Sequence, residues 1–222
     1  MMNDLFKPLK EVAKSFTFKY TKLGAPKYPY NIEPMQLAIM ISELDRLKDI
    51  KGNIVEIGVA RGMTTRFLAE HIVNQNLQES MMLFAIDTFE SFIKKDLEYE
   101  VKHRGKSMSE LKGFSYNDYK TWQKNFIKFP FIKAVKADCS SFEYDKVAPV
   151  KLALLDVDLY IPIKNALSKL FEVTLKGGVI FVDDVKNNSI YDGAYQAYME
   201  FCKNHSIKPI IIGTKCGVIY KD

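Results

Sequence analysis

Short apolar runs alternate with segments whose apolar residues recur at the helical period along most of the chain. The apolar runs predict strands over 53–57, 82–86, 132–136, 151–156 and 178–182. Such continuous runs of Val, Ile and Leu are typical of strands that are buried on both faces of a parallel sheet. Between them, helical spacing predicts helices over 35–48, 64–73, 117–126, 162–173 and 191–205.

Two further apolar runs near the C-terminus change the picture from a purely parallel sheet. Residues 208–212 and 217–220 flank Gly213 and predict a closing hairpin. Alternating strands and helices followed by a hairpin indicate an α/β fold. We therefore expect a Rossmann-like, doubly wound sheet of about seven strands, mostly parallel with a C-terminal antiparallel hairpin, and helices on both faces.

The pattern is weaker in two segments, and these suggest the domain organisation. Residues 1–32 are basic and aromatic, and Pro26 and Pro29 argue against one continuous helix there. We expect an N-terminal arm or lid over 1–32 and a single domain over 33–222. Residues 88–121 are the most polar part of the chain, so we expect a mobile lid insertion over 93–120, with only partial order over 94–112.

Composition narrows the class of protein. The 222 residues are 47% hydrophobic and 27% charged, and a net charge of +5 arises from 32 basic and 27 acidic residues. This mixed balance argues against a nucleic-acid partner, and no apolar run is long enough to span a membrane. The N-terminus lacks the pattern of a signal peptide. Three cysteines at unrelated spacings predict buried, reduced thiols, and hence a cytoplasmic protein.

A glycine-containing loop follows the first predicted strand. It reads Glu56-Ile57-Gly58-Val59-Ala60-Arg61-Gly62 and leads into the helix that starts at Thr64. Gly58 permits a tight turn, and Gly62 lets the helix N-terminus approach a ligand. Asp87 lies 25 residues after Gly62, at the end of the second strand, where Rossmann-type folds bind ribose hydroxyls. These features indicate a ligand that contains a nucleoside.

Paired aspartates end the fourth and fifth predicted strands. Asp156 and Asp158 end one strand, and Asp183 and Asp184 end the other. Four carboxylates that converge at one sheet edge with no lysine between them would repel one another unless a cation or a shared proton held them. Asp156 and Asp158 are two residues apart, so both side chains point the same way in an extended segment. The pattern predicts a divalent-cation site at the carboxyl edge of the sheet.

These motifs together resemble those of the macrocin O-methyltransferase (TylF/MycF-like) family. The similarity covers roughly residues 30–205, and the pairing of D-x-D-x-Y with a later G-G-hhhh-D-D is its most specific part. The four matching stretches are 55–62, 87–92, 156–160 and 177–184. The resemblance implies a class I methyltransferase that uses S-adenosylmethionine and a divalent cation, usually Mg²⁺, to methylate a sugar hydroxyl. It implies a sugar or other small-molecule acceptor and leaves a homo-oligomer open.

The resemblance also implies roles for individual residues. The cation ligands fall on Asp156, Asp183 and Asp184, and the general base falls on Asp158. On the cofactor side the residues are Glu56, Gly58, Gly62, Thr64, Asp87, Thr88, Asp138, Cys139 and Asp156. Of these, Asp138 would lie near the adenine, in the stretch Ala137-Asp138-Cys139-Ser140, which matches the family loosely.

Two other readings of the same motifs differ in chemistry. The first is an S-adenosylmethionine enzyme that methylates RNA or an amine; against it, the [DN]-P-P-[YFW] motif of amino methyltransferases is absent. The second is a non-methylating binding protein or a hydroxylase-like relative, because a fold does not determine its function. Binding of S-adenosylmethionine separates this last class from the other two.

Overall fold

The computed structural model describes residues 7–222, which divide into two compact units. The first unit ends at Asn31, and the second comprises Ile32–Asp222. In the first unit, helix α2 (Lys7–Tyr20) and the short 3-10 helix η1 (Lys22–Gly24) lie against each other. Helix α2 ends before Pro26, as the prolines require. A helix in this segment was not among the elements expected from the sequence.

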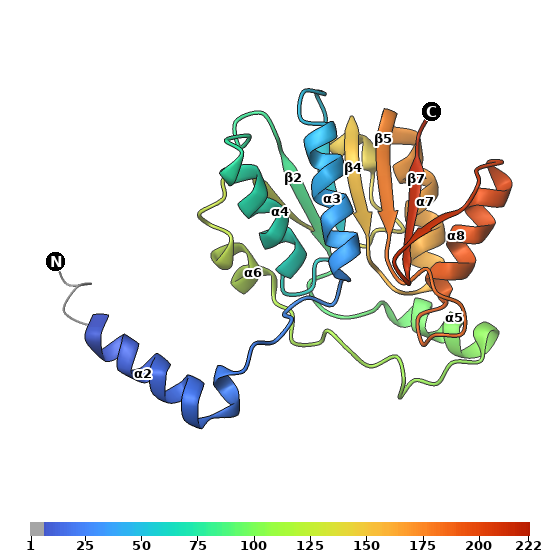
Figure 1. Ribbon diagram of the computed structural model, residues 1–222. Coiled ribbons are helices and arrows are strands. Elements are labelled where there is room, and N and C mark those ends of the chain that lie inside the picture. The colour runs from blue at the N-terminus through green and yellow to red at the C-terminus, as the bar shows by residue number, and fades with distance from the viewer. Residues whose placement is uncertain (1–6) are drawn as a thin grey trace. The chain divides into compact units, whose positions relative to one another are not determined.

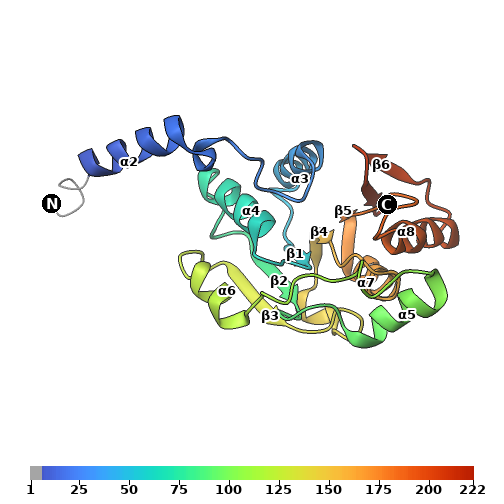
Figure 2. The same ribbon diagram turned by 90° about the horizontal axis from the view of Figure 1, so that it is seen from below.

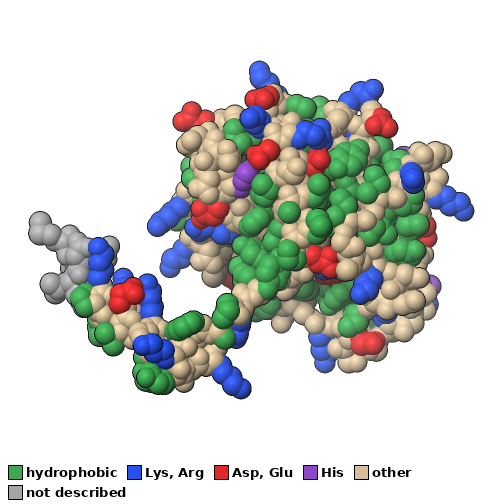
Figure 3. Space-filling view, viewed as in Figure 1, with side chains coloured by type: hydrophobic (Ala, Val, Ile, Leu, Met, Phe, Trp, Pro, Cys, Tyr) green, Lys and Arg blue, Asp and Glu red, His purple; other side chains and the backbone are tan. Residues whose placement is uncertain are grey.

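The surface of α2 is both apolar and basic. Its large apolar side chains are exposed, among them Leu9, Val12 and Phe16. Residues 7–31 contain six lysines and one glutamate, so their net charge of +5 equals that of the whole chain. Figure 3 shows these green and blue side chains along the segment at the lower left.

The second unit is built on a seven-stranded sheet of order β3-β2-β1-β4-β5-β7-β6. Five strands are parallel, and β7 runs antiparallel to both β5 and β6. The strands are β1 (Asn53–Ile57), β2 (Leu83–Asp87), β3 (Ile132–Lys136), β4 (Val150–Leu155), β5 (Thr174–Val182), β6 (Ile210–Ile212) and β7 (Cys216–Tyr220). The predicted doubly wound sheet with a C-terminal antiparallel hairpin is confirmed.

Helices cover both faces of this sheet. They are α3 (Pro34–Arg46), α4 (Met63–Asn74), α5 (Lys94–Arg104), α6 (Tyr119–Asn125), α7 (Tyr160–Val173) and α8 (Gly193–Asn204), with a 3-10 turn η2 (Tyr144–Val147) before β4. Figure 2 shows α3 and α4 on one side of the sheet and α7 and α8 on the other. Every residue of β4 is buried, which explains its continuous apolar run.

Alternation along the central strands distributes side chains between two cores. On the α7 side, Val55 and Ile57 of β1 join Ala153 and Leu155 of β4. The residues that alternate with these, such as Ile54 and Leu152, are also fully buried but belong to the opposite face. Burial on both faces fixes the strand register, so the residue that follows each strand emerges at a defined place on the sheet edge.

Helix α5 corrects one expectation. The sequence predicted only partial order over 94–112, but Lys94–Arg104 form a helix that begins after Ile93 and ends at Gly105 in a left-handed conformation. Its charged side chains are not all solvated, because Asp96 and Glu100 are buried. Figure 1 shows α5 and the segment after it running below the arrowheads of the parallel strands. The helix was not predicted because its buried residues are charged and give no apolar pattern in the sequence.

Candidate functional site

The loop after β1 turns sharply because it passes very close to the chain that leaves β4. Gly58 has φ +82°, and a Cβ built on it would lie 1.8 Å from the carbonyl oxygen of Asp156. The backbone N–H of Gly58 donates to Ile86 O at 2.9 Å, and that of Asp156 donates to Ile57 O at 2.8 Å. The ends of β1, β2 and β4 are thus hydrogen bonded where the glycine loop begins.

Asp87 organises this loop. Its Oδ2 accepts from the backbone N–H groups of Val59 (2.8 Å) and Ala60 (3.2 Å), and its Oδ1 accepts from Phe89 N (2.6 Å). Thr88 contacts the same carboxylate through its hydroxyl at 3.4 Å. Asp87, which was predicted at the ribose, and Thr88, which was predicted on the cofactor side, therefore lie beside the glycine loop, and the carboxylate of Asp87 is bound to the loop backbone.

Aromatic side chains pack closely against Gly62 and leave no room for a Cβ there. Gly62 has φ +82°, and a Cβ on it would lie 2.5 Å from the ring of Phe126 and 2.9 Å from Trp122 Nε1. A side chain at this position would therefore collide with Trp122 of α6 and with Phe126, which follows that helix. Thr64, in the first turn of α4, is buried.

Glu56 is the most deeply buried acid on the cofactor side. It is 1% exposed, and its Oε2 has no hydrogen-bond partner within residues 7–222. Burial raises the pKa of the Glu56 carboxyl to about 8, and the nearby charge of Asp87 also raises it. A pKa of about 8 favours the neutral form of the Glu56 carboxyl at pH 7.

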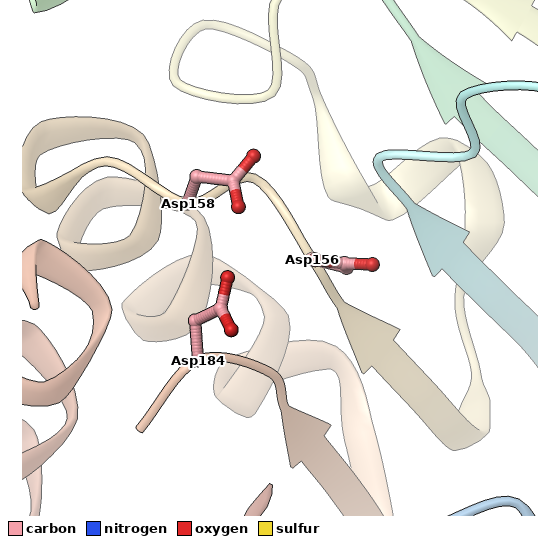
Figure 4. A group of neighbouring side chains, drawn as sticks. All are labelled: Asp156, Asp158 and Asp184. Atoms are coloured by element: carbon pink, nitrogen blue, oxygen red, sulfur yellow. The ribbon is translucent and has the colours of Figure 1, made fainter. Parts of the chain in front are cut away.

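Three carboxylates converge at the neighbouring edge of the sheet. One oxygen from each of Asp156, Asp158 and Asp184 lies within 4.8 Å of the others. Figure 4 shows the carboxyl groups of Asp158 and Asp184 facing each other, while Asp156 extends toward the loop after β1. The carboxyl ends of β4 and β5 therefore bring together three of the four aspartates expected at this edge, and Asp183 is outside the group.

Backbone turns aim two of these side chains. Asp158 has φ +62° and Asp184 has φ +57°, both in the left-handed region that non-glycine residues seldom occupy. Leu159 N donates to Val157 O at 2.6 Å, which closes a tight turn around Asp158 before α7 begins at Tyr160. Strain of this kind, at two of the three clustered residues, is characteristic of functional sites.

Burial and mutual repulsion shift the titration of the cluster. Burial raises the pKa of Asp156 well above its usual range, and the charges of Asp183 and Asp158 raise it further. Burial, followed by the charge of Asp184, likewise raises the pKa of Asp158. The pKa of Asp183 is raised by burial and by Asp184, and Lys215 opposes that shift. The cluster therefore favours protons or other cations.

Asp183 lies outside the group of three clustered carboxylates, but it shares a basic partner with Asp184. Its Oδ2 accepts from Lys215 Nζ at 2.9 Å, and Asp184 Oδ1 accepts from the same ammonium at 2.7 Å. The Oδ1 atom of Asp183 is buried, and no described residue bonds to it. The expectation that no lysine would lie among the aspartates was wrong, because Lys215 contacts two of them. The local sequence shows no sign of this contact, since Lys215 is remote from the aspartates along the chain.

The last predicted pair, Asp138 and Cys139, follows β3. Asp138 accepts from Ser140 N at 2.8 Å and from Lys95 Nζ of α5 at 3.2 Å. Cys139 is buried, and burial raises the pKa of its thiol to about 12. The thiol is thus a neutral packing group, and all three cysteines are free and buried. Asp96, beside Lys95, is also buried, and this burial raises its pKa to about 6.

The predicted residues therefore form two adjoining groups rather than one. Glu56, Gly58, Asp87 and Thr88 surround the glycine loop, and Asp156 connects them to the group that contains Asp158 and Asp184. Sequence reasoning missed Lys215 and Glu100. Nothing in the local sequence of either residue signals its role, because each acts through a contact with a distant element.

The fold and the site can be compared with known proteins. A family model described as "Macrocin-O-methyltransferase (TylF)" matches residues 35–221. No curated protein sequence matches the chain.

Solved methyltransferases share the fold at low sequence identity. CalS11, a calicheamicin methyltransferase, superposes with a TM-score of 0.65 at 15% identity, over 96% of this chain and 92% of that one. The O-methyltransferase NovP superposes with a TM-score of 0.63 at 15% identity, over 83% of this chain and 78% of that one. An apo structure of CalS11, titled a TDP-rhamnose 3'-O-methyltransferase, has a TM-score of 0.58 at 16% identity, over 96% and 93%.

The match of the family model covers most of the chain, and the glycine loop and aspartate groups lie at the sheet edge where this fold binds its ligands. The chain thus belongs to the macrocin O-methyltransferase family and is an O-methyltransferase that uses S-adenosylmethionine.

Proposed function

We propose that this protein transfers a methyl group from S-adenosylmethionine to a hydroxyl group of a sugar-bearing small molecule or glycan precursor, with the help of a divalent cation. The convergence of Asp156, Asp158 and Asp184 within 4.8 Å, directly beside the glycine loop, carries this proposal. It puts a candidate cation site next to a candidate cofactor site. Family membership supports the sugar hydroxyl as acceptor.

The residues of the acidic group fit a hard divalent cation such as Mg²⁺. All the donors are carboxylate oxygens, which Mg²⁺ prefers. The unpartnered Asp183 Oδ1 and the raised pKa of Asp156 both indicate a group that a cation would stabilise. We propose Asp156, Asp183 and Asp184 as the ligands. When bound, the cation would act as a Lewis acid that lowers the pKa of the acceptor hydroxyl.

Asp158 is our candidate for the general base. Burial raises the pKa of the Asp158 carboxyl well above the usual range. A carboxylate with a higher pKa is a stronger base and therefore a better proton acceptor. The left-handed backbone at Asp158 and the tight turn closed by Leu159 hold its oxygens at the cluster. In this role Asp158 accepts the hydroxyl proton at a carboxylate oxygen.

The cofactor residues lie around the glycine loop in this proposal. When bound, S-adenosylmethionine supplies a methyl group on a sulfonium, which an oxygen nucleophile attacks. Glu56 is neutral and buried, so it is placed to lose its proton to solvent and balance a cationic group of the ligand. Asp87 would share its carboxylate between the loop backbone and the ribose, and Asp138 would lie near the adenine.

The acceptor side is less determined than the cofactor side. We propose that residues 93–120, with α5 at their start, form part of the acceptor pocket. The net charge of +5 of the whole chain favours an acidic or phosphate-bearing acceptor such as a nucleotide sugar.

The metal dependence is tested with chelator. Methyl transfer to a set of nucleotide sugars is measured with EDTA-treated protein, and Mg²⁺ is then added in excess. We expect activity to be lost and then restored. Full activity in EDTA would remove the cation from the proposal. Calorimetric titration with S-adenosylmethionine provides the control that the treated protein still binds its cofactor.

A further inference from the structure

Lys215 is bonded to two of the four aspartates at the sheet edge. Its Nζ lies 2.9 Å from Asp183 Oδ2 and 2.7 Å from Asp184 Oδ1, and its side chain is 19% exposed. Buried acids are normally neutralised by a proton, a metal ion or a basic side chain. Here a basic side chain of the protein supplies part of the neutralising charge.

The antiparallel register of β5 and β7 determines the position of this lysine. Val182, the last residue of β5, pairs with Gly217, so Lys215, which comes just before β7, lies beside the residues that follow β5. The backbone N–H of Val185 donates to Lys215 O at 2.7 Å and holds the two segments together beyond the strand ends. The hairpin turn is itself held by Glu33, whose carboxylate accepts from Thr214 N at 2.9 Å. Lys215 is therefore anchored through its main chain as well as through its ammonium.

A divalent cation and this ammonium would compete for the same two carboxylate groups, those of Asp183 and Asp184. A cation bound by Asp183 and Asp184 lies close to Lys215 Nζ, and like charges in a partly buried site repel strongly. The unpartnered Asp183 Oδ1 is a second, independent sign that the site can take another cationic partner. Removing the lysine charge would leave the carboxylates in place and make them more available.

We propose that Lys215 is an internal competitor of the divalent cation: its ammonium occupies the Asp183–Asp184 side of the acidic group, and a divalent cation binds there by taking these oxygens over from it. The inference rests on the cation site of the proposed function. It makes Lys215 a residue that weakens cation affinity and so sets the concentration at which the site fills.

The test measures binding of Mn²⁺ alone to the full chain by isothermal titration calorimetry at pH 7.5. Lys215→Met keeps the length of the side chain and removes its charge. We expect Lys215→Met to bind Mn²⁺ at least tenfold more tightly than the wild-type protein. Lys221→Met is the matched control, because Lys221 follows β7 and donates to the carbonyl oxygens of Phe171 and Glu172, not to the aspartates. Its Mn²⁺ affinity should match that of the wild type.

The possible outcomes separate this inference from the proposed function. If the wild type binds no Mn²⁺ but Lys215→Met does, the competition is supported and the metal dependence proposed above fails. Lys215→Met that binds Mn²⁺ no more tightly than the wild type overturns the inference, whether or not the wild type binds. Circular dichroism checks that the variant is folded, and Lys215→Gln serves as a second neutral variant with the same expected outcome.

A second measurement uses the wild-type protein and does not depend on folding of a variant. Acylation of lysines is quantified by peptide mass spectrometry with and without saturating Mn²⁺. Displacement of the ammonium predicts severalfold faster labelling of Lys215 with Mn²⁺, whereas labelling of Lys221 stays constant. Unchanged labelling of Lys215 in a Mn²⁺-saturated protein would contradict the exchange.

Discussion

The carboxylate of Glu100, on α5, accepts a 2.7 Å hydrogen bond from the backbone N–H of Tyr160, the first residue of α7. This contact joins elements 60 residues apart and lies two residues after Asp158. The other oxygen of Glu100 accepts from Arg104 Nε at 2.8 Å, and Arg104 also donates to Asp192 at 2.7 Å. A buried ion-pair network thus ties α5 to the turn that holds the proposed base.

Glu100→Ala tests whether this network supports the site. Removal of the Glu100 carboxylate leaves Arg104 partly unpaired and the backbone N–H of Tyr160 without its acceptor. We therefore expect the free energy of unfolding to fall by about 3 kcal/mol. Turnover should also fall as the Asp158 turn loosens. Urea denaturation and methyl-transfer kinetics measure the two effects. Glu98→Ala is the control on the same helix, because Glu98 makes only an exposed 3.6 Å pair with Lys94 and should change stability by less than about 0.5 kcal/mol.

Gly58→Ala tests the close approach of the glycine loop to β4. The added Cβ would meet the Asp156 carbonyl oxygen at 1.8 Å, so the loop or the aspartate must move. We expect a loss of at least about 3 kcal/mol in stability and loss of S-adenosylmethionine binding by calorimetry. Gly105→Ala has a similar positive φ of +69° but meets nothing within 4 Å, so it should cost only about 1 kcal/mol. Equal effects of the two substitutions would show that backbone strain alone matters.

Asp158→Asn tests the assignment of the base. The amide keeps the shape of the side chain but cannot accept the hydroxyl proton as a carboxylate does. We expect kcat to fall by about 10²–10⁴-fold while the affinity for S-adenosylmethionine stays within about threefold. Asp156→Asn is the companion variant, and it should weaken Mn²⁺ binding as well as turnover. Unchanged turnover in Asp158→Asn would remove Asp158 as the base.

Glu56→Gln tests the buried neutral acid through the pH dependence of stability. The folded-state pKa of Glu56 is about 8, above its ordinary value of 4.5, so folding is penalised once the pH rises above 4.5 and the full penalty is reached above pH 8. The glutamine variant cannot ionise and avoids this cost. We expect it to exceed the wild type by about 2–4 kcal/mol in unfolding free energy at pH 9 and to match it near pH 4, measured by urea denaturation. A difference that does not change with pH would contradict a neutral Glu56.

The sequence alone determined the sheet and the place of the site on it. Continuous apolar runs between helical patterns are enough to specify buried parallel strands, since burial on both faces leaves few alternatives. Residues at the carboxyl ends of those strands or just beyond them, such as Asp87, Asp156 and Asp184, must then lie at one edge of the sheet. The antiparallel hairpin was predictable from Gly213 and its flanking apolar runs. Helix α5 was not, because its buried residues are charged and carry no apolar period.

Only the tertiary structure decided which charges meet. Whether a carboxylate is free, paired or protonated depends on contacts between elements that are distant in the sequence, and local patterns do not encode them. The pairing of β5 with β7 brings Lys215 next to Asp183 and Asp184, and helix packing brings Glu100 to the N-terminus of α7. The four aspartates therefore have different neighbours in the fold. Asp156, Asp158 and Asp184 cluster together, and Asp183 shares the ammonium of Lys215 with Asp184.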